Sequence, residues 1–217
     1  MRRYQLAIFD MDGTILYTLE DLKESLNYAL REHGYPTRTL DEVRRFVGNG
    51  VRKLVERGAP AGTPVEALDA LYETFHVYYK VHNLDTSRPY DGIGELLEKL
   101  RGVGMGTAVV SNKVDYGVQS LCARFFPGQF DMAIGEKPGM RVKPAPDMVN
   151  AVLEALEVSA EDAVYIGDSE VDLQTARNAQ MDAISVSWGF RDEAFLRENG
   201  AGRIVATPEE LYRILTE

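Results

Sequence analysis

The sequence is poor in cysteine and contains no long apolar run. Cys122 is the single cysteine among 217 residues, which excludes an internal disulfide framework and fits a reducing compartment. It lies in VQSLCARFF, a pattern typical of an amphipathic helix, so we expect a packed thiol rather than a nucleophile. No apolar segment approaches the roughly 20 residues that cross a bilayer. The opening MRRYQLAIFD starts like a signal peptide, but Asp10 ends its apolar stretch too early. We therefore expect a soluble cytoplasmic protein.

Positive charge is also scarce. Lysine and arginine number 24 against 34 aspartate and glutamate residues, a net charge of -10. A sequence-independent nucleic-acid binder needs a basic stripe and a membrane-surface protein needs a polybasic segment, so both partners are disfavoured. An anionic small molecule is not excluded, because a few lysines, amide groups and a metal ion can dominate a pocket.

Apolar runs of strand length are present, and each ends in Gly, Asp or Ser. The clearest are QLAIFD, MGTAVVS, DAVYIGD and DAISVS, with weaker ones at 132–135 and 203–206. Near-continuous apolar strands are typical of a parallel sheet covered on both faces. Amphipathic segments such as IGELLEKLRGVG and PDMVNAVLEALEV lie between them. The alternation predicts an α/β fold with a doubly wound, Rossmann-like parallel sheet.

One long stretch, 17–86, contains no convincing strand. Apolar residues at helical spacing mark two faces in it: Leu19, Leu22, Leu26 and Leu30, and then Val65, Leu68, Leu71, Phe75 and Tyr78 or Tyr79. Unstructured loops of this length are uncommon in compact domains. We therefore predict an all-helical domain over 17–86, inserted after the first strand into a core formed by 1–16 and 87–217. It must lie over the strand end that carries Asp10.

Polar residues gather where the predicted strands end, which is where open parallel sheets bind ligands. They are Asp10 and Asp12, then Ser111, Asn112 and Lys113, then Lys143 in VKPAPD, then Asp168 and Asp172 in GDSEVD. Like charges at close range repel, so this density of acids predicts a divalent cation. Oxygen ligands favour Mg²⁺.

Asp10 and Asp168 are the expected side-chain ligands of the metal, with the backbone carbonyl of Asp12 as a third. Asp172 lies four residues after Asp168, where it could orient Ser111, Lys143 or a metal-bound water instead of binding the metal. Asn112 and Lys113 could contact the substrate or cap the following helix.

Four ordered motifs carry a family resemblance over nearly the whole chain. DMDGT at 10–14, VVSN, KPAP with Lys143, and GDSEVD resemble the motifs of the haloacid dehalogenase superfamily of phosphotransferases. More narrowly, VGNGVRKLVERG, SRPYDGIGELLEKL and VVSNK look like the phosphoglycolate phosphatases of that superfamily.

The resemblance implies a Mg²⁺-dependent phosphatase of small phosphomonoesters, with 2-phosphoglycolate as the favoured substrate. Asp10 would attack phosphorus and form an aspartyl-phosphate. Asp12, kept protonated by acidic surroundings, would protonate the leaving group and then activate water. Ser111 and Lys143 would hold phosphoryl oxygens. The insertion resembles the family's helical cap, and the expected substrate contacts are Thr14, Asn112, Lys113 and Arg52, with Lys53 as an alternative to Arg52.

Several other readings stay open. A pyrophosphatase, a nucleotidase, a sugar-phosphate phosphatase or a phosphomutase like β-phosphoglucomutase would share these motifs, whereas a dehalogenase or a phospho-aspartate signalling domain fits them less well. We expect a small phosphate ester as the partner, no nucleic acid or membrane, and a monomer or homodimer. His33, His76, His82 and Trp188 are expected to be structural or surface residues.

Overall fold

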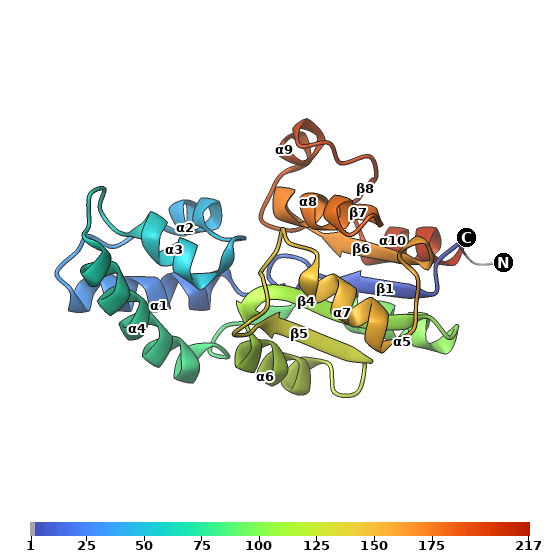
Figure 1. Ribbon diagram of the computed structural model, residues 1–217, viewed down its shortest axis with the longest axis horizontal. Helices are drawn as coiled ribbons and strands as arrows, with labels where there is room; N and C mark the ends of the chain where they lie inside the picture. The colour runs from blue at the N-terminus through green and yellow to red at the C-terminus, as the bar shows by residue number, and fades with distance from the viewer. Residues whose placement is uncertain (1–2) are drawn as a thin grey trace.

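The strands lie where the apolar runs predict them. The structure, a computed structural model, describes residues 3–217. Six parallel strands form one sheet in the order β5-β4-β1-β6-β7-β8 (Figure 1). Their bounds are β1 Leu6–Phe9, β4 Gly106–Val114, β5 Met132–Glu136, β6 Ala163–Gly167, β7 Asp182–Val186 and β8 Ile204–Val205. The weaker runs are strands as well, and the predicted doubly wound α/β fold is confirmed.

Helices cover both faces of this sheet, as the apolar strands require. One face carries α5 Ile93–Gly102, α6 Asp115–Phe125 and α10 Pro208–Thr216, and the other carries α7 Asp147–Ala155 and α8 Glu170–Asn178. The central strand β1 packs against helices on both faces, because successive side chains of a strand point to opposite faces of the sheet. Ala7 and Phe9 belong to the first apolar cluster, and Leu6 and Ile8 to the second. Burying each large side chain stabilises the sheet by about 1.5–3 kcal/mol, so β1 is a firm base for the residues that follow it.

Four helices form a bundle beside the sheet (Figure 1). They are α1 Leu19–Glu32, α2 Leu40–Phe46, α3 Gly50–Gly58 and α4 Val65–His82. Their apolar cluster contains the four predicted leucines of α1 together with Leu71, Phe75 and Tyr79 of α4. The predicted face of α4 is wrong at its start, since Val65 follows the helix-capping Pro64 and is 63% exposed. Within residues 3–217 no helix is both long and apolar enough to cross a membrane.

A two-stranded ribbon marks the place where the chain leaves the sheet and returns to it. β2 Leu16–Tyr17 pairs antiparallel with β3 Arg88–Pro89, which the sequence does not predict. Asp21 of α1 reinforces this connection. Its carboxylate accepts hydrogen bonds from the backbone and hydroxyl groups of Thr86 and Ser87, at 2.5–2.9 Å. The bundle is therefore tied to the sheet close to the end of β1.

The remaining short elements complete the chain. A 3₁₀ turn at Ala160–Asp162 precedes β6, and α9 Glu193–Glu198 lies between β7 and β8. The loop between β7 and α9 returns to the edge of the sheet next to the bundle, and it contributes to the site described below.

Candidate active site

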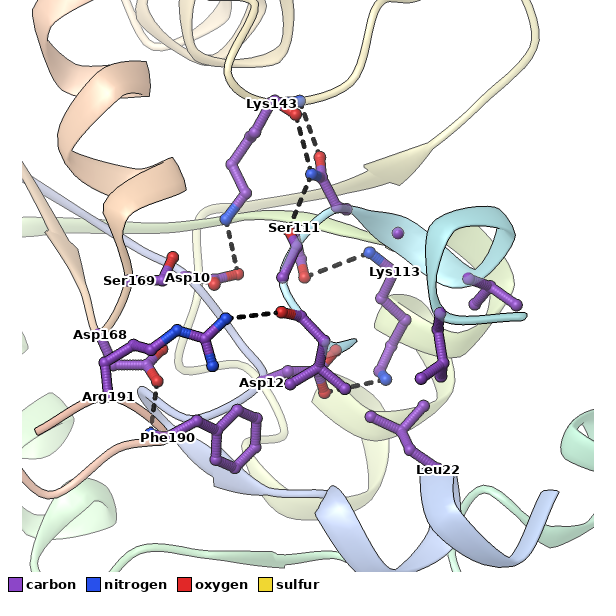
Figure 2. Close-up of a pocket in the computed structure, with 16 residues that line it drawn as sticks. Asp10, Asp12, Leu22, Ser111, Lys113, Lys143, Asp168, Ser169, Phe190 and Arg191 are labelled. Atoms are coloured by element: carbon purple, nitrogen blue, oxygen red, sulfur yellow. Dashed lines mark hydrogen bonds and ion pairs between the residues drawn. The ribbon is translucent and has the colours of Figure 1, made fainter. Parts of the chain in front are cut away.

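The strands β1, β4 and β6 bring their polar residues to one pocket between the sheet and the bundle (Figure 2). The predicted residues that line it are Asp10, Asp12, Ser111, Asn112, Lys113, Lys143 and Asp168. One detail of the prediction is wrong: β4 does not end at Ser111 but continues to Val114. Its pairing with β5 is irregular between Val110 and Val114. The side chains of that stretch therefore project from the end of a strand and not from a free loop.

Three buried acids lie together at the centre of the site. Asp10, Asp168 and Asp172 each place a carboxylate oxygen within 4.8 Å of the others. The ammonium of Lys143 lies 2.9 Å from Asp10 Oδ1 and 2.7 Å from Asp172 Oδ1. Burial raises the pKa of Asp10 to about 7 against the opposing effect of Lys143, and burial also raises the pKa of Asp168 well above its ordinary value. The cluster therefore holds more acid than its lysine can balance.

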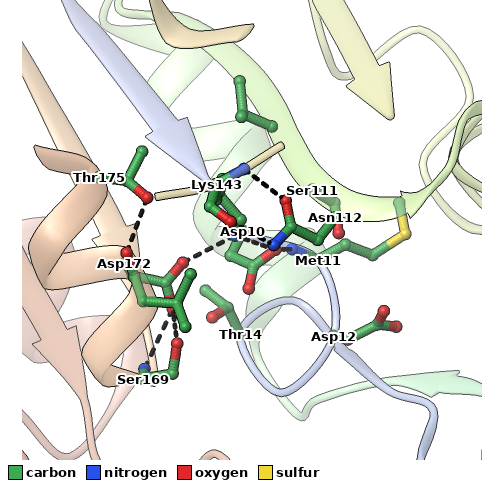
Figure 3. A network of polar contacts seen from close by, with 12 residues as sticks. Asp10, Met11, Asp12, Thr14, Ser111, Asn112, Lys143, Ser169, Asp172 and Thr175 are labelled. Carbon is green, nitrogen blue, oxygen red and sulfur yellow. Dashed lines mark hydrogen bonds and ion pairs between the residues drawn. The ribbon is translucent and has the colours of Figure 1, made fainter. Parts of the chain in front are cut away.

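Asp172 is held from both sides. Its Oδ2 accepts hydrogen bonds from the backbone and hydroxyl of Ser169, at 3.1 and 2.6 Å, at the start of α8, while Oδ1 faces Lys143 (Figure 3). A Cβ at Gly167 would lie 2.3 Å from Asp172 Cγ, so only glycine lets this carboxylate approach β6. The arrangement suits a residue that orients Lys143.

Asp168 has a different set of partners. Oδ1 accepts from Thr14 Oγ1 at 3.1 Å, and Oδ2 accepts from the backbone N–H of Phe190 at 2.7 Å. Gly13 has φ +87°, and a Cβ there would lie 2.3 Å from Asp168 Oδ2. Thr14, a predicted substrate contact, is fully buried and does not line the pocket. Its hydroxyl instead orients Asp168, and its carbonyl accepts from Trp188 Nε1 at 2.9 Å.

Asp12 turns away from the other acids, as Figure 3 shows. Its Oδ1 lies 2.9 Å from the ammonium of Lys113 and accepts from Thr18 Oγ1 at 2.6 Å. The charged group in contact with Asp12 is thus a cation and not another acid. The backbone carbonyl of Asp12 accepts no hydrogen bond from residues 3–217, which leaves it available as a metal ligand.

Asn112 joins three segments of the chain. Its amide nitrogen donates to the carbonyls of Lys143 and Gly48, at 3.0 and 3.1 Å, and its Oδ1 accepts from the Lys143 backbone at 2.7 Å. The alternative that Asn112 or Lys113 caps the next helix is wrong, since α6 begins at Asp115 without a side-chain cap. Ser111 is buried beside Asn112 and lines the pocket.

The structure does not bring Arg52, a predicted substrate contact, into the pocket. Its guanidinium lies 3.2 Å from Glu56 and 2.5 Å from Asp69, and Lys53 likewise pairs with Glu56 at 2.6 Å. Neither cation lines the pocket. In α3 the residues that do so are apolar, because the helix turns Val51 towards the site.

Arg191 is the pocket cation that the sequence analysis missed. It follows β7 in the stretch SWGFRDE and lies in the pocket next to Phe190 (Figure 2). Its guanidinium donates to the carbonyls of Arg44 and Val47 at 2.6 and 3.0 Å. Its Nε lies 3.2 Å from Glu170. The signal in the sequence is its position, because Arg191 follows the predicted strand DAISVS, whose carboxyl end lies at the same edge of the sheet as Asp10 and Asp168.

The bundle presents a largely apolar wall to these charges. The residues that form it, with Phe190 from the sheet side, are Leu22, Val47, Val51 and Leu54. Tyr79 packs in the bundle as expected, but its hydroxyl also accepts from Lys113 Nζ at 2.7 Å. His76 is a second link, bonded to Tyr72 within α4 and to Tyr116 of α6.

A parallel sheet with buried carboxylates and a lysine at the carboxyl ends of its central strands, and a second lysine from an adjacent loop, is the layout of an α/β enzyme. The model of the haloacid dehalogenase-like hydrolase family matches residues 7–186. The chain therefore belongs to this family, as its motifs indicate.

Known relatives narrow the class. The chain is 36% identical to phosphoglycolate phosphatase of Caulobacter vibrioides over 85% of this chain and 80% of that one. It is 33% identical to phosphoglycolate phosphatase of Agrobacterium fabrum over 86% of this chain and 82% of that one. A crystal structure from Lactobacillus delbrueckii subsp. bulgaricus, of a protein proposed to be a phosphoglycolate phosphatase, superimposes with a TM-score of 0.94 and 42% identity over the full length of both chains. The predicted class of enzyme, a phosphatase of this family, is confirmed.

Proposed function

We propose that the protein is a Mg²⁺-dependent phosphatase that hydrolyses small phosphomonoesters through an aspartyl-phosphate on Asp10, with 2-phosphoglycolate as its favoured substrate. The observation that carries the proposal is the buried group of Asp10, Asp168 and Asp172 around Lys143. We also propose that the cap domain spans 17–86. The proposed location is the cytoplasm, and the proposed assembly is a monomer or homodimer.

The charges of the site fit a divalent cation. When ionised, the three carboxylates carry three negative charges and Lys143 balances one of them, because Lys113 contacts Asp12 and none of these three acids. Two buried negative charges left without a partner would be costly. Carboxylates of Asp10 and Asp168 with the carbonyl of Asp12 supply the hard oxygen ligands that Mg²⁺ prefers. When bound, the cation neutralises charge on the phosphoryl group and orients it.

The two oxygens of Asp10 are not equivalent. Oδ1 accepts from the backbone of Met11 at 2.7 Å and from Lys143 at 2.9 Å. No hydrogen bond within residues 3–217 ends on Oδ2, so this oxygen is the one free to attack. It forms a bond to phosphorus while the bond from phosphorus to the alcohol oxygen breaks. Water then attacks the aspartyl-phosphate, which releases phosphate and restores the Asp10 carboxylate.

The neighbouring residues assist both steps. Lys143 and the Ser111 hydroxyl lie in the same pocket and donate to the phosphoryl oxygens as charge shifts during transfer. Asp12 enters the first step protonated, gives that proton to the departing alkoxide, and recovers a proton from the attacking water in the second step. Positioned general acid–base catalysis of this kind typically contributes about 10²- to 10⁴-fold.

The substrate is proposed to be small and to carry a second negative charge. The apolar wall of the bundle closes over the acids, which leaves Lys113 and Arg191 as cations away from Lys143. A carboxylate next to the phosphate, as in 2-phosphoglycolate, suits this combination. The names of the relatives at 33% and 36% identity support the same choice.

A panel of phosphate compounds tests this function. Phosphate release is measured from 2-phosphoglycolate, pyrophosphate, a nucleoside monophosphate, several sugar phosphates and p-nitrophenyl phosphate, with Mg²⁺ and with excess chelator. We expect metal-dependent release, fastest from 2-phosphoglycolate. A different best substrate would correct the specificity alone, and transfer only in the presence of a sugar bisphosphate would favour a phosphomutase. No release from any compound would overturn the phosphatase.

A further inference from the structure

Tyr79 links the apolar interior of the bundle to the charged side of the pocket. Its hydroxyl accepts from Lys113 Nζ at 2.7 Å, and the same ammonium lies 2.9 Å from Asp12 Oδ1. Tyr79 is 1% exposed, as is the Lys113 side chain. A buried ammonium needs partners, and within residues 3–217 the side chains bonded to this one are those of Tyr79 and Asp12.

The tyrosine is suited to direct this ammonium without neutralising it. Burial raises the pKa of Tyr79 to about 12, so the phenol is uncharged near neutral pH and accepts as a neutral group. The positive charge of Lys113 then stays available to Asp12 and to the pocket. Replacing the phenol with a carboxylate would cancel that charge, which a neutral acceptor does not do.

The position of the hydroxyl is set by the bundle. The ring of Tyr79 stacks on Phe75 with centroids 5.3 Å apart, inside the apolar cluster that also includes α1 and α3. Lys113, by contrast, is fixed to β4 in the sheet. The hydrogen bond between them can form only when α4 is seated over the end of β4.

We propose that Tyr79 is a positioning residue of the reaction, whose hydroxyl holds the Lys113 ammonium on Asp12 when the bundle is seated and so aligns Asp12 for proton transfer to the leaving group. This inference rests on the proposed phosphatase function. It assigns to the bundle a part in the chemistry as well as in closing the pocket.

The leaving group provides the decisive test. An alkoxide needs a proton as its bond to phosphorus breaks, whereas p-nitrophenolate leaves without one. Tyr79→Phe removes the hydroxyl and keeps the ring. We expect its kcat/KM for 2-phosphoglycolate to fall about tenfold, corresponding to about 1.4 kcal/mol, while kcat/KM for p-nitrophenyl phosphate falls less than about twofold. The ratio kcat/KM is used because it covers the steps through departure of the alcohol.

Tyr78→Phe is the matched control. Tyr78 neighbours Tyr79 on α4, but its ring stacks on Tyr28, with centroids 4.1 Å apart, and its hydroxyl makes no contact with Lys113. We expect wild-type kcat/KM on both substrates. Combining Tyr79→Phe with Lys113→Met should cost little more than Lys113→Met alone, because the tyrosine acts through the lysine.

Each outcome bears on the proposal. Equal losses on the two substrates, or additive losses in the double variant, would overturn it in favour of a structural role for Tyr79. Wild-type kcat/KM for Tyr79→Phe would overturn it while leaving the phosphatase intact. A wild-type enzyme that releases phosphate from no substrate would overturn the proposed function, and this inference with it.

Discussion

The two sides of the pocket are built from different chemistry. The sheet side presents carboxylates and ammonium groups, each held by two or more partners. The bundle side presents apolar side chains, and where it meets the sheet side it offers acceptors: the carbonyls of Arg44, Val47 and Gly48 and the hydroxyl of Tyr79. The donors, from Arg191, Asn112 and Lys113, all belong to the sheet side.

In the proposed function, the sheet side carries the reacting groups and the bundle side covers them. Asp10, Asp168 and Asp172 are fixed by a sheet whose central strand is buried on both faces, so their geometry does not depend on the bundle. Asp12 differs, because its partner Lys113 is bonded to Tyr79 of α4. The bundle is held by a small number of polar contacts, which can break and re-form when substrate enters and product leaves. Substitutions of the reacting acids on the sheet side should therefore remove the chemistry, whereas substitutions at the contacts between the two sides should reduce it.

Asp10→Asn is expected to have the largest effect. Removing the attacking carboxylate should lower kcat by on the order of 10⁴-fold or more, measured as phosphate release under saturating substrate. Asp91→Asn, an exposed acid outside the site, serves as the control and should keep wild-type activity. Retention of more than about a tenth of the activity by Asp10→Asn would refute its role as nucleophile.

Asp12→Asn should come next. Loss of the proton donor should slow kcat by about 10²- to 10⁴-fold with KM largely unchanged, because Asp12 acts on the leaving group and not on the bound phosphate. Steady-state kinetics on 2-phosphoglycolate measure both constants. Equal turnover in this variant would remove Asp12 from the mechanism.

The effect of metal on stability should depend on pH. The pKa of Asp10 is raised to about 7 in the folded protein and is near its ordinary value when unfolded. The folded state therefore binds more protons, and the stability of the metal-free protein falls as pH rises towards and through 7. Mg²⁺ replaces those protons, so it should raise Tm more at pH 8 than at pH 5.5. At saturating metal we expect about 5 °C or more at pH 8.

Differential scanning fluorimetry with Mg²⁺ and with chelator measures this difference. In Asp10→Asn the titrating ligand is gone, and the dependence of the metal effect on pH should be smaller. The same rise in Tm at both pH values in the wild type would contradict the assignment of the acids as a cation site.

The smallest effects are expected for two arginines, one on each side of the pocket. Arg191→Gln removes the charged donor to two bundle carbonyls, and kcat/KM should fall about tenfold because seating of the bundle is impaired. Arg52→Gln breaks only half-exposed ion pairs, which contribute little, so its kcat/KM should change less than about twofold. A larger loss for Arg52→Gln than for Arg191→Gln would favour Arg52 as the substrate contact and would contradict the proposed contribution of Arg191 to seating the bundle.

The sequence predicts the sheet side far better than the bundle side. Buried parallel strands are continuous apolar runs, and the residues at their ends meet because the strands are parallel, which places Asp10, Ser111 and Asp168 together. Lys143 joins them from the loop that precedes α7. The partners of Thr14 and Asp12 could not be read in this way. They depend on how the tight turn after β1 directs each side chain.

On the bundle side, the rotation of a helix about its axis decides which of its residues face the pocket. The prediction of Arg52 relied on its nearness to a glycine-rich loop. The apolar spacing of Val51 and Leu54 already favours a pocket-facing side that excludes Arg52, since adjacent helical residues point about 100° apart. Tyr79 was predicted correctly as a packing residue, but the reach of its hydroxyl to Lys113 requires the bundle to be placed over the sheet. The β2–β3 ribbon has too few residues to leave a strand pattern.

The central claim is that Asp10 itself becomes phosphorylated, and trapping that species tests it most directly. The enzyme is quenched with acid during turnover of 2-phosphoglycolate with Mg²⁺, digested, and analysed by mass spectrometry. We predict a phosphoryl group on the peptide that contains Asp10, lost on treatment with hydroxylamine and absent from Asp10→Asn. Sustained turnover with no phosphorylated peptide, or with the phosphoryl group on another residue, would contradict the account.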